Sequence, residues 1–189
     1  MELLEQRILS DGRLLPGGIL KVDNFLNHQM DPMLLMAMAK EWHRLFENDG
    51  VNKILTIEAS GIAMAILAGL EFRCPVIFAK KSKTKNISGS LYQTDVPSFT
   101  HGNTNTVVVS KDYLNENDRV LLIDDFLATG AALVGLRDLV SQAGATLVGA
   151  GCAIEKRFQG GGDKLRAEGV RVESLARIVR MDDNGIVFG

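Results

Sequence analysis

The sequence predicts one α/β domain with a central, mostly parallel β-sheet flanked by helices. Two strand–helix–strand units carry this prediction, one over residues 53–79 and the other over 120–154. Their strands are uniformly apolar, which is typical of parallel strands covered on both faces. The crossovers of such sheets are right-handed and their ligands bind at the carboxyl ends of the strands, so we expect the functional residues at that edge.

The composition favours a globular cytoplasmic protein. The 189 residues are 46% hydrophobic, which is enough for one sizeable core, and the formal net charge of −2 disfavours a dedicated nucleic-acid-binding protein. Cys74 and Cys152 stand far apart in apolar surroundings, which predicts buried thiols in a reducing compartment. Because no apolar run approaches the ~20 residues of a membrane span and the N-terminus resembles no signal peptide, we expect no membrane partner.

The segment before the first unit predicts two helices. Met1 to Ser10 has its leucines on one side, which is typical of a short amphipathic helix. Residues 18–26 are expected to be extended or looped. Asp31 followed by Pro32 is a strong helix start, and this second helix is expected to run to about Glu47.

The first unit begins with the strand Lys53–Ile57 and the polar turn Glu58–Gly61. The helix over 62–70 is apolar all round, which predicts that it is buried on every side. A second strand follows at Pro75–Ala79. The next segment, 80–105, is polar and has four lysines in its first six positions, so a mobile loop is expected there.

The second unit opens with Val120–Ala132, around which the chain is organised. Its sequence, VLLIDDFLATGAA, predicts a buried strand, an acidic tip, a tight turn and a helix N-terminus. A helix N-terminus binds phosphate through its unpaired N–H groups, and glycine lets the backbone approach closely. The turn residues suited to this role are Ala128, Thr129, Gly130, Ala131 and Ala132.

Asp124 and Asp125 follow the predicted strand Val120–Ile123. Their carboxylates repel phosphate but accept hydrogen bonds from sugar hydroxyls, so acids beside a phosphate turn indicate a ribose 5-phosphate. On a straight strand neighbouring side chains face opposite ways, and we therefore expect a bend at the acids. The alternative is an ordinary strand-to-helix loop. Walker A and dinucleotide-binding motifs are absent from the sequence.

Val120–Ala132 closely resembles the phosphoribosyl-pyrophosphate (PRPP) signature of the type I phosphoribosyltransferases. The resemblance extends over almost the whole chain and implies the fold of that family. It implies a pyrophosphate loop at Glu58–Gly61, a flexible catalytic loop at 80–105, and a small hood subdomain that holds the base, built from about 1–30 and 155–189. A single domain over 1–189 is therefore expected. Beyond the second unit, we expect a short helix at 163–168, a last strand at 170–175 and a turn at 182–185.

The resemblance also implies roles for residues of this chain. Asp124 and Asp125 are expected to bind the ribose hydroxyls, and residues 128–132 the 5-phosphate. Mg²⁺ is expected as the cofactor, held mainly by PRPP and pyrophosphate, with no protein ligand assigned. The residues expected at the pyrophosphate are Glu58, Ala59, Ser60 and Gly61.

The pyrophosphate loop departs from the family pattern at one position. Many relatives carry Arg or Lys where this chain has Ser60. The cationic help must then come from elsewhere, and Lys81 is the best candidate. Because family members commonly form homodimers, the resemblance implies that Lys81 reaches the active site of a neighbouring chain.

The purine is expected to bind Lys156, Asn27 and Leu20. The ammonium of Lys156 can only donate, which suits a 6-oxopurine and disfavours adenine, and its charge favours the readily deprotonated xanthine. The Asn27 amide could read a 2-oxo group, while Leu20 could pack on the ring. A guanine, hypoxanthine or adenine phosphoribosyltransferase remains an alternative. So does a PRPP-sensing transcription regulator without catalysis, although the sequence shows no basic recognition helix.

Overall fold

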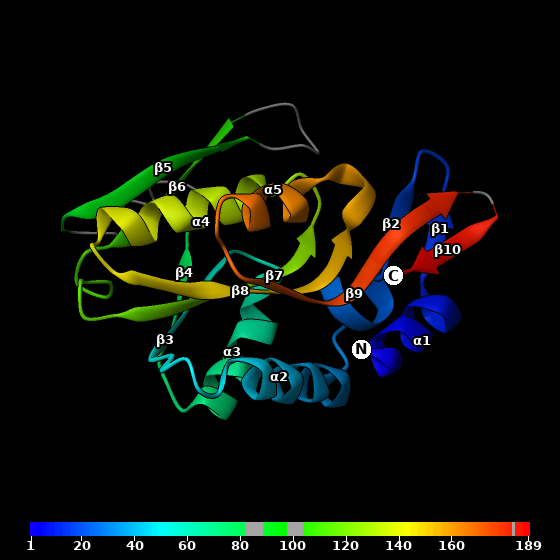
Figure 1. Ribbon diagram of the computed structural model, residues 1–189, viewed down its shortest axis with the longest axis horizontal. Helices are drawn as coiled ribbons and strands as arrows, with labels where there is room; N and C mark the ends of the chain where they lie inside the picture. Colours follow the sequence, from blue (N-terminus) through cyan, green and yellow to red (C-terminus); the bar gives the residue numbers. More distant parts are fainter. Residues whose placement is uncertain (82–88, 98–103, 183) are drawn as a thin grey trace.

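The computed structural model describes residues 1–81, 89–97, 104–182 and 184–189. Six strands of this part form one sheet in the order β10-β9-β8-β7-β3-β4, with β10 antiparallel to β9 and the others parallel (Figure 1). The predicted mostly parallel sheet is therefore confirmed. The strands are β3 (Lys53–Ile57), β4 (Val76–Ala79), β7 (Arg119–Leu127), β8 (Thr146–Lys156), β9 (Val172–Asp182) and β10 (Gly185–Phe188).

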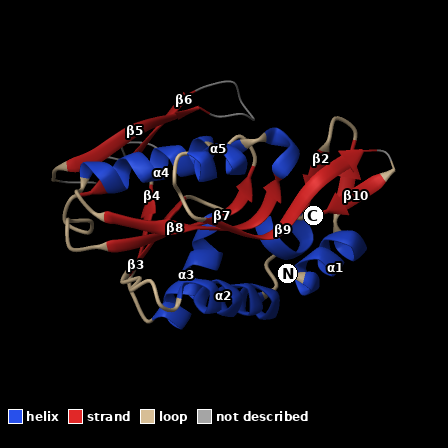
Figure 2. Cartoon of the chain, viewed as in Figure 1, coloured by secondary structure: helices blue, strands red, loops and turns tan. Residues whose placement is uncertain are grey.

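Helices cover both faces of this sheet (Figure 2). α2 (Pro32–Phe46) and α3 (Gly61–Phe72) lie on one face, whereas α4 (Ala131–Gln142) and α5 (Gly161–Ala167) lie on the other. Each face has its own apolar cluster, the first centred on aromatic residues of α2 and the second on leucines of α4. Apolar side chains on both faces explain why the strands of this sheet are uniformly apolar.

The predicted start of α2 is confirmed in detail. The Asp31 carboxylate accepts hydrogen bonds from the backbone N–H groups of Met33 (3.0 Å) and Leu34 (3.2 Å), and Pro32 occupies the first helical position. This cap satisfies donors that have no partner within the helix and fixes where α2 begins. Among the described residues, no helix is both long and apolar enough to cross a membrane.

The prediction that the first crossover helix is buried all round is wrong. α3 buries the stripe formed by Met64, Ala65 and Ala68, but Ile66 is 54% exposed and Leu70 is 61% exposed. The sheet and α2 cover only one side of α3, so its outer side faces solvent in the single chain. The uniform composition of the helix therefore needs an explanation other than burial within this fold.

The prediction of an irregular loop over 80–105 is also wrong for the residues that the structure describes. β5 (Leu91–Pro97) pairs with β6 (Thr104–Ser110) in an antiparallel ribbon that packs on α4. Val96, Val107 and Val109 are buried, so this ribbon has an apolar face despite its polar composition. Residues 82–88 and 98–103 of the predicted loop lie outside the described part of the chain.

The two ends of the chain lie side by side at one end of the sheet (Figure 1). They include α1 (Glu2–Asp11), the hairpin of β1 (Arg13–Leu15) and β2 (Ile19–Lys21), and the short π-helix η1 (Asp23–Asn27). The predicted last strand, 170–175, is too short: β9 continues to Asp182 and turns back into β10. The predicted turn at 182–185 includes residue 183, which lies outside the described part of the chain, and β10 was not predicted from the sequence.

Candidate active site

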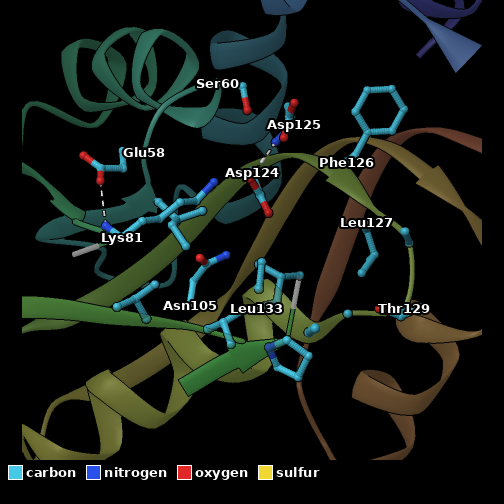
Figure 3. A pocket seen from close by; sticks show the side chains of 18 residues that line it. Glu58, Ser60, Lys81, Asn105, Asp124, Asp125, Phe126, Leu127, Thr129 and Leu133 are labelled. Atoms are coloured by element: carbon cyan, nitrogen blue, oxygen red, sulfur yellow. Dashed lines mark hydrogen bonds between the residues drawn. The ribbon is translucent and has the colours of Figure 1, made fainter. Parts of the chain in front are cut away.

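A cavity of about 250 Å³ opens at the carboxyl ends of β3 and β7 (Figure 3). This is the edge of a parallel sheet at which ligands bind. The cavity brings together ten of the residues predicted for PRPP and catalysis. These are Glu58, Ser60, Lys81, Asp124, Asp125, Ala128, Thr129, Gly130, Ala131 and Ala132.

Strand β7 runs straight through the two acids, so the predicted bend is wrong. Its pairing with β8 continues from Asp124 opposite Cys152 to Leu127 opposite Glu155. Figure 3 shows the two carboxylates on opposite sides of the strand, yet both Asp124 and Asp125 line the cavity. A ligand that contacts both carboxylates must therefore extend around the end of β7. No bend in the strand is needed for such a ligand.

Asp124 is held in an environment that disfavours its negative charge. Its side chain is buried, and the backbone N–H of Asp125 donates to its Oδ1 at 3.0 Å. Burial raises the pKa of Asp124 well above its usual range, the charge of Asp125 raises it further, and Lys81 offsets this only in part. Within the described residues, neither acid forms an ion pair. The site is therefore prepared for a cationic partner.

The turn after β7 presents the N-terminus of α4 to the cavity. Gly130 is the N-cap of α4 and has a φ of +85°, a left-handed conformation that favours glycine. α4 is 12 residues long, so the unpaired N–H groups of its first turn carry the positive end of a full helix dipole. Backbone donors and the Thr129 hydroxyl together form a suitable cradle for a phosphate.

The predicted pyrophosphate loop reaches the cavity through Glu58 and Ser60, whereas Ala59 and Gly61 do not line it. Gly61 has a packing role instead. A Cβ atom at this position would lie 2.1 Å from Oγ1 of the buried Thr56, so only glycine lets α3 begin this close to β3. The loop is thereby held against the strand that carries it.

Lys81 lines the cavity of its own chain, and the expectation that it reaches a neighbouring site stays a prediction. Its backbone N–H donates to Oε1 of Glu58 at 2.6 Å (Figure 3). The bridge between Lys80 and Val108 connects this segment to β6. These contacts place the Lys81 backbone beside residues 58–61.

The three residues predicted for the base lie outside this cavity. Leu20 is buried in the core, and Asn27 has a buried Oδ1 for which the described residues provide no hydrogen-bond partner. Lys156 donates to the backbone oxygen of Gly18 at 3.3 Å, and its Nζ lies 5.7 Å from the ring centroid of Phe126. Burial lowers the pKa of Lys156. Since Phe126 also lines the cavity, it lies between Lys156 and the turn formed by residues 128–132.

Several residues that line the cavity were not predicted from the sequence. Phe126 and Leu127 lie inside the central motif, where strand periodicity could have indicated that β7 continues past the acids. The other group comes from the β5–β6 ribbon, for which the sequence predicts a loop. It consists of Val96, Pro97, Asn105 and Val107.

Comparison with known proteins agrees with this geometry. Residues 21–175 match the phosphoribosyl transferase domain family, and the chain belongs to this family. It is similar over its whole length to proteins named xanthine phosphoribosyltransferase. The one from Finegoldia magna is 53% identical over 188 residues, covering 100% of this chain and 99% of the relative. The one from Bacillus cereus strain AH187 is 50% identical, covering 100% of this chain and 95% of the relative.

Solved structures share the fold. An APRTase from Giardia lamblia, complexed with 9-deazaadenine, has a TM-score of 0.80 at 20% identity, covering 94% of this chain and 98% of the other. Adenine phosphoribosyltransferase from Rhodothermus marinus has a TM-score of 0.76 at 21% identity, covering 94% and 100%. The fold is thus that of the type I phosphoribosyltransferases, as the sequence predicted. At these identities the likeness concerns the fold alone.

Proposed function

We propose that this protein transfers the 5-phosphoribosyl group from PRPP to xanthine in purine salvage, giving xanthosine 5′-monophosphate and pyrophosphate. The observation that carries the proposal is one cavity that combines the acid pair with the N-terminus of α4. The full-length similarity to proteins named xanthine phosphoribosyltransferase supports the choice of purine.

We assign the cavity residues to parts of PRPP by their chemistry. Residues 128–132 offer hydrogen-bond donors and bind the 5-phosphate, because α4 begins there. Asp124 and Asp125 accept from the ribose hydroxyls. Residues 58–61 and Lys81 flank the pyrophosphate, and the backbone N–H groups at the start of α3 supply donors there.

The transfer exchanges one bond at C1 of the ribose. A purine nitrogen attacks C1, the bond from C1 to the pyrophosphate oxygen breaks, and pyrophosphate leaves with the electron pair. The purine nitrogen releases its proton. Positive charge develops on the sugar during this exchange, and the carboxylates of Asp124 and Asp125 stabilise it. The burial of Asp124 strengthens this effect, because water screens the charges less.

Mg²⁺ is the proposed cofactor. Among the described residues, no three His, Cys, Asp or Glu side chains form a metal-binding group. The carboxylates of Glu58, Asp124 and Asp125 nevertheless line the cavity, and these oxygen ligands fit a Mg²⁺ ion that takes few protein ligands and is bound largely by phosphates. When bound, the ion supplies positive charge that stabilises the departing pyrophosphate.

For the purine we propose the base side formed by Leu20, Asn27 and Lys156. An unpartnered buried acceptor costs about 1–3 kcal/mol, so Oδ1 of Asn27 gains from a ligand N–H. Lys156 donates to the 6-oxo group in exchange for its contact with Gly18. Both residues belong to the chain ends, residues 1–30 and 155–189, which we propose form a base-holding hood within one domain.

An assay with four purines tests the substrate. The full chain is incubated with PRPP, Mg²⁺ and one purine, and nucleotide formation is measured. We expect xanthine to give the highest kcat/KM, followed by guanine or hypoxanthine, with adenine the poorest. Faster turnover of adenine than of xanthine would overturn the substrate assignment. PRPP binding without turnover of any purine would instead indicate a PRPP-sensing regulator.

We also propose that the protein is a cytoplasmic homodimer. Ile66 and Leu70 lie one helical turn apart on the exposed side of α3, and a shared apolar face of this kind is typical of an interface. The double variant Ile66→Glu/Leu70→Glu should therefore elute as a monomer in size-exclusion chromatography with light scattering. Leu9→Glu is the control, since Leu9 is equally exposed on α1. A monomeric wild-type chain would contradict the proposal.

Cys74 and Cys152, which are both free thiols, fit the proposed cytoplasmic location, because the cytoplasm is reducing.

A further inference from the structure

The first residues of α5 touch the phosphate turn backbone to backbone. The N–H of Gly161 donates to the carbonyl oxygen of Ala128 at 3.1 Å. A Cβ atom on Gly161 would lie 2.4 Å from that oxygen, 2.4 Å from the carbonyl carbon of Thr129 and 2.5 Å from the nitrogen of Gly130. All three are backbone atoms, so no side chain can rotate to relieve the overlap. Only glycine permits this contact.

α5 cannot withdraw easily from the turn. Arg166 of α5 donates to both carboxylate oxygens of Glu155, at 2.8 and 2.7 Å, and Glu155 is fully buried on β8. Burial raises the pKa of Glu155, but the hydrogen bonds and charge of Arg166 outweigh this and hold it below its usual value. Gly162 lies against the same carboxylate, and Leu165 is buried beneath the turn. A buried ion pair therefore anchors the helix, and breaking it is costly.

We propose that Gly161 is a positioning residue for phosphoribosyl transfer, through which α5 sets the orientation of the 128–130 backbone. This inference rests on the proposed phosphate-binding role of that turn. Gly161 does not line the cavity and acts only through the turn backbone. Gly130 lies directly opposite Gly161 in this contact. A Cβ atom on Gly130 would lie only 3.3 Å from the carbonyl oxygen of Gly161.

The direction of the turn N–H groups decides how well they bind phosphate. Small misplacements of binding groups lower rates steeply, and sites held by a rigid second layer are the more accurate ones. Because α5 is anchored to β8, added bulk at residue 161 displaces the turn rather than the helix. We therefore expect the effect to fall on PRPP and not on the purine.

Steady-state kinetics of Gly161→Ala test the proposal. We expect the KM for PRPP to rise at least about tenfold, as displacement of a binding group predicts, while the KM for xanthine changes less than twofold. Gly160→Asn is the matched control: Gly160 has a φ of +77° that asparagine tolerates, and a Cβ atom there meets nothing within 4 Å. A folded Gly161→Ala enzyme with unchanged KM for PRPP would overturn the inference, as would equal losses in both variants.

Amide hydrogen exchange of the wild-type chain provides a test that needs no variant. PRPP should slow exchange at Thr129 and Gly130 and also at Gly161, whose N–H is bonded to the turn. Exchange at Gly169, whose N–H bonds to Arg166 at the far end of α5, should stay unchanged. Protection at the turn without protection at Gly161 would overturn the inference alone. Absence of PRPP binding to the wild-type chain would instead overturn the proposed function.

Discussion

The proposed sugar-phosphate side and the proposed base side of the site differ in how the chain builds them. The proposed sugar-phosphate side consists of one strand end and the turn after it, residues 124–132, where the backbone N–H groups at the start of α4 are the proposed phosphate donors. The proposed base side draws Leu20 and Asn27 from the first 30 residues and Lys156 from the end of β8. Lys156 bonds to Gly18, which lies 138 residues away. In this proposal the transfer reaction depends on one compact motif, whereas the choice of purine depends on residues from separate parts of the chain.

The largest expected effect comes from the sugar-phosphate side. Asp124→Asn keeps the shape of the side chain and the acceptor for the Asp125 N–H, but it removes the charge. We expect kcat to fall about a hundredfold to a thousandfold, the usual loss when a group aimed at developing charge is removed. Asp138→Asn, on the exposed side of α4, is the control in the same assay. Full activity of Asp124→Asn would remove the acid pair from the mechanism.

On the base side, Lys156→Met should lower kcat/KM for xanthine about tenfold to a hundredfold, because a hydrogen bond to a charged group contributes about 1.5–3 kcal/mol. Adenine should suffer less, since it offers no 6-oxo group. Lys164→Met, an exposed lysine of α5, serves as the control. Equal losses for all four purines would show that Lys156 supports the fold rather than the choice of base.

Lys81 tests whether each site is complete within one chain. Lys81 is exposed at the mouth of the cavity, so Lys81→Ala should lower kcat only about tenfold through the loss of a solvent-screened charge. In mixed dimers of Lys81→Ala and Asp124→Asn chains, no site has both residues if they act within one chain, and activity should stay low. Recovery to about half of the wild-type activity would show that Lys81 reaches the neighbouring site.

The smallest effect concerns stability. Burial and the charge of Asp125 raise the pKa of Asp124 above its ordinary value of 3.8, so the folded chain holds this proton more tightly than the unfolded chain. The resulting stability is present in full below the ordinary pKa and is lost as the pH rises through the raised one. Asp124→Asn lacks this loss and should melt at a higher temperature than the wild type at neutral pH.

Thermal unfolding from pH 4 to pH 8 measures this difference. The advantage of Asp124→Asn should grow with pH, whereas Asp138→Asn should follow the wild type throughout. A variant that is less stable than the wild type at neutral pH would contradict the account of a charge held for function at the expense of stability.

The sequence made the sugar-phosphate side predictable because its residues are consecutive. An apolar strand, two acids and a glycine-containing turn predict the strand, the turn and the start of α4, but not that β7 continues past the acids to Leu127. The β5–β6 ribbon was missed because its apolar face, with Val96 and Val107, forms only by packing on α4. The exposed side of α3 was not predicted because the helix is apolar on all sides. Its composition therefore cannot show which side packs against the sheet and α2. The relation of Lys156 to Gly18 depends on where the chain ends meet, which no local pattern encodes.

The central claim is that the sugar-phosphate side binds PRPP independently of the base side. Calorimetric titration of PRPP with Mg²⁺ in the absence of purine tests this claim most directly. The wild type, Asp124→Asn and Lys156→Met are compared under the same conditions. We predict that Asp124→Asn raises the Kd for PRPP at least about tenfold, since one lost charge-assisted contact contributes about 1.5–3 kcal/mol. Lys156→Met should leave this Kd unchanged. Weakened PRPP binding in Lys156→Met together with normal binding in Asp124→Asn would contradict the account.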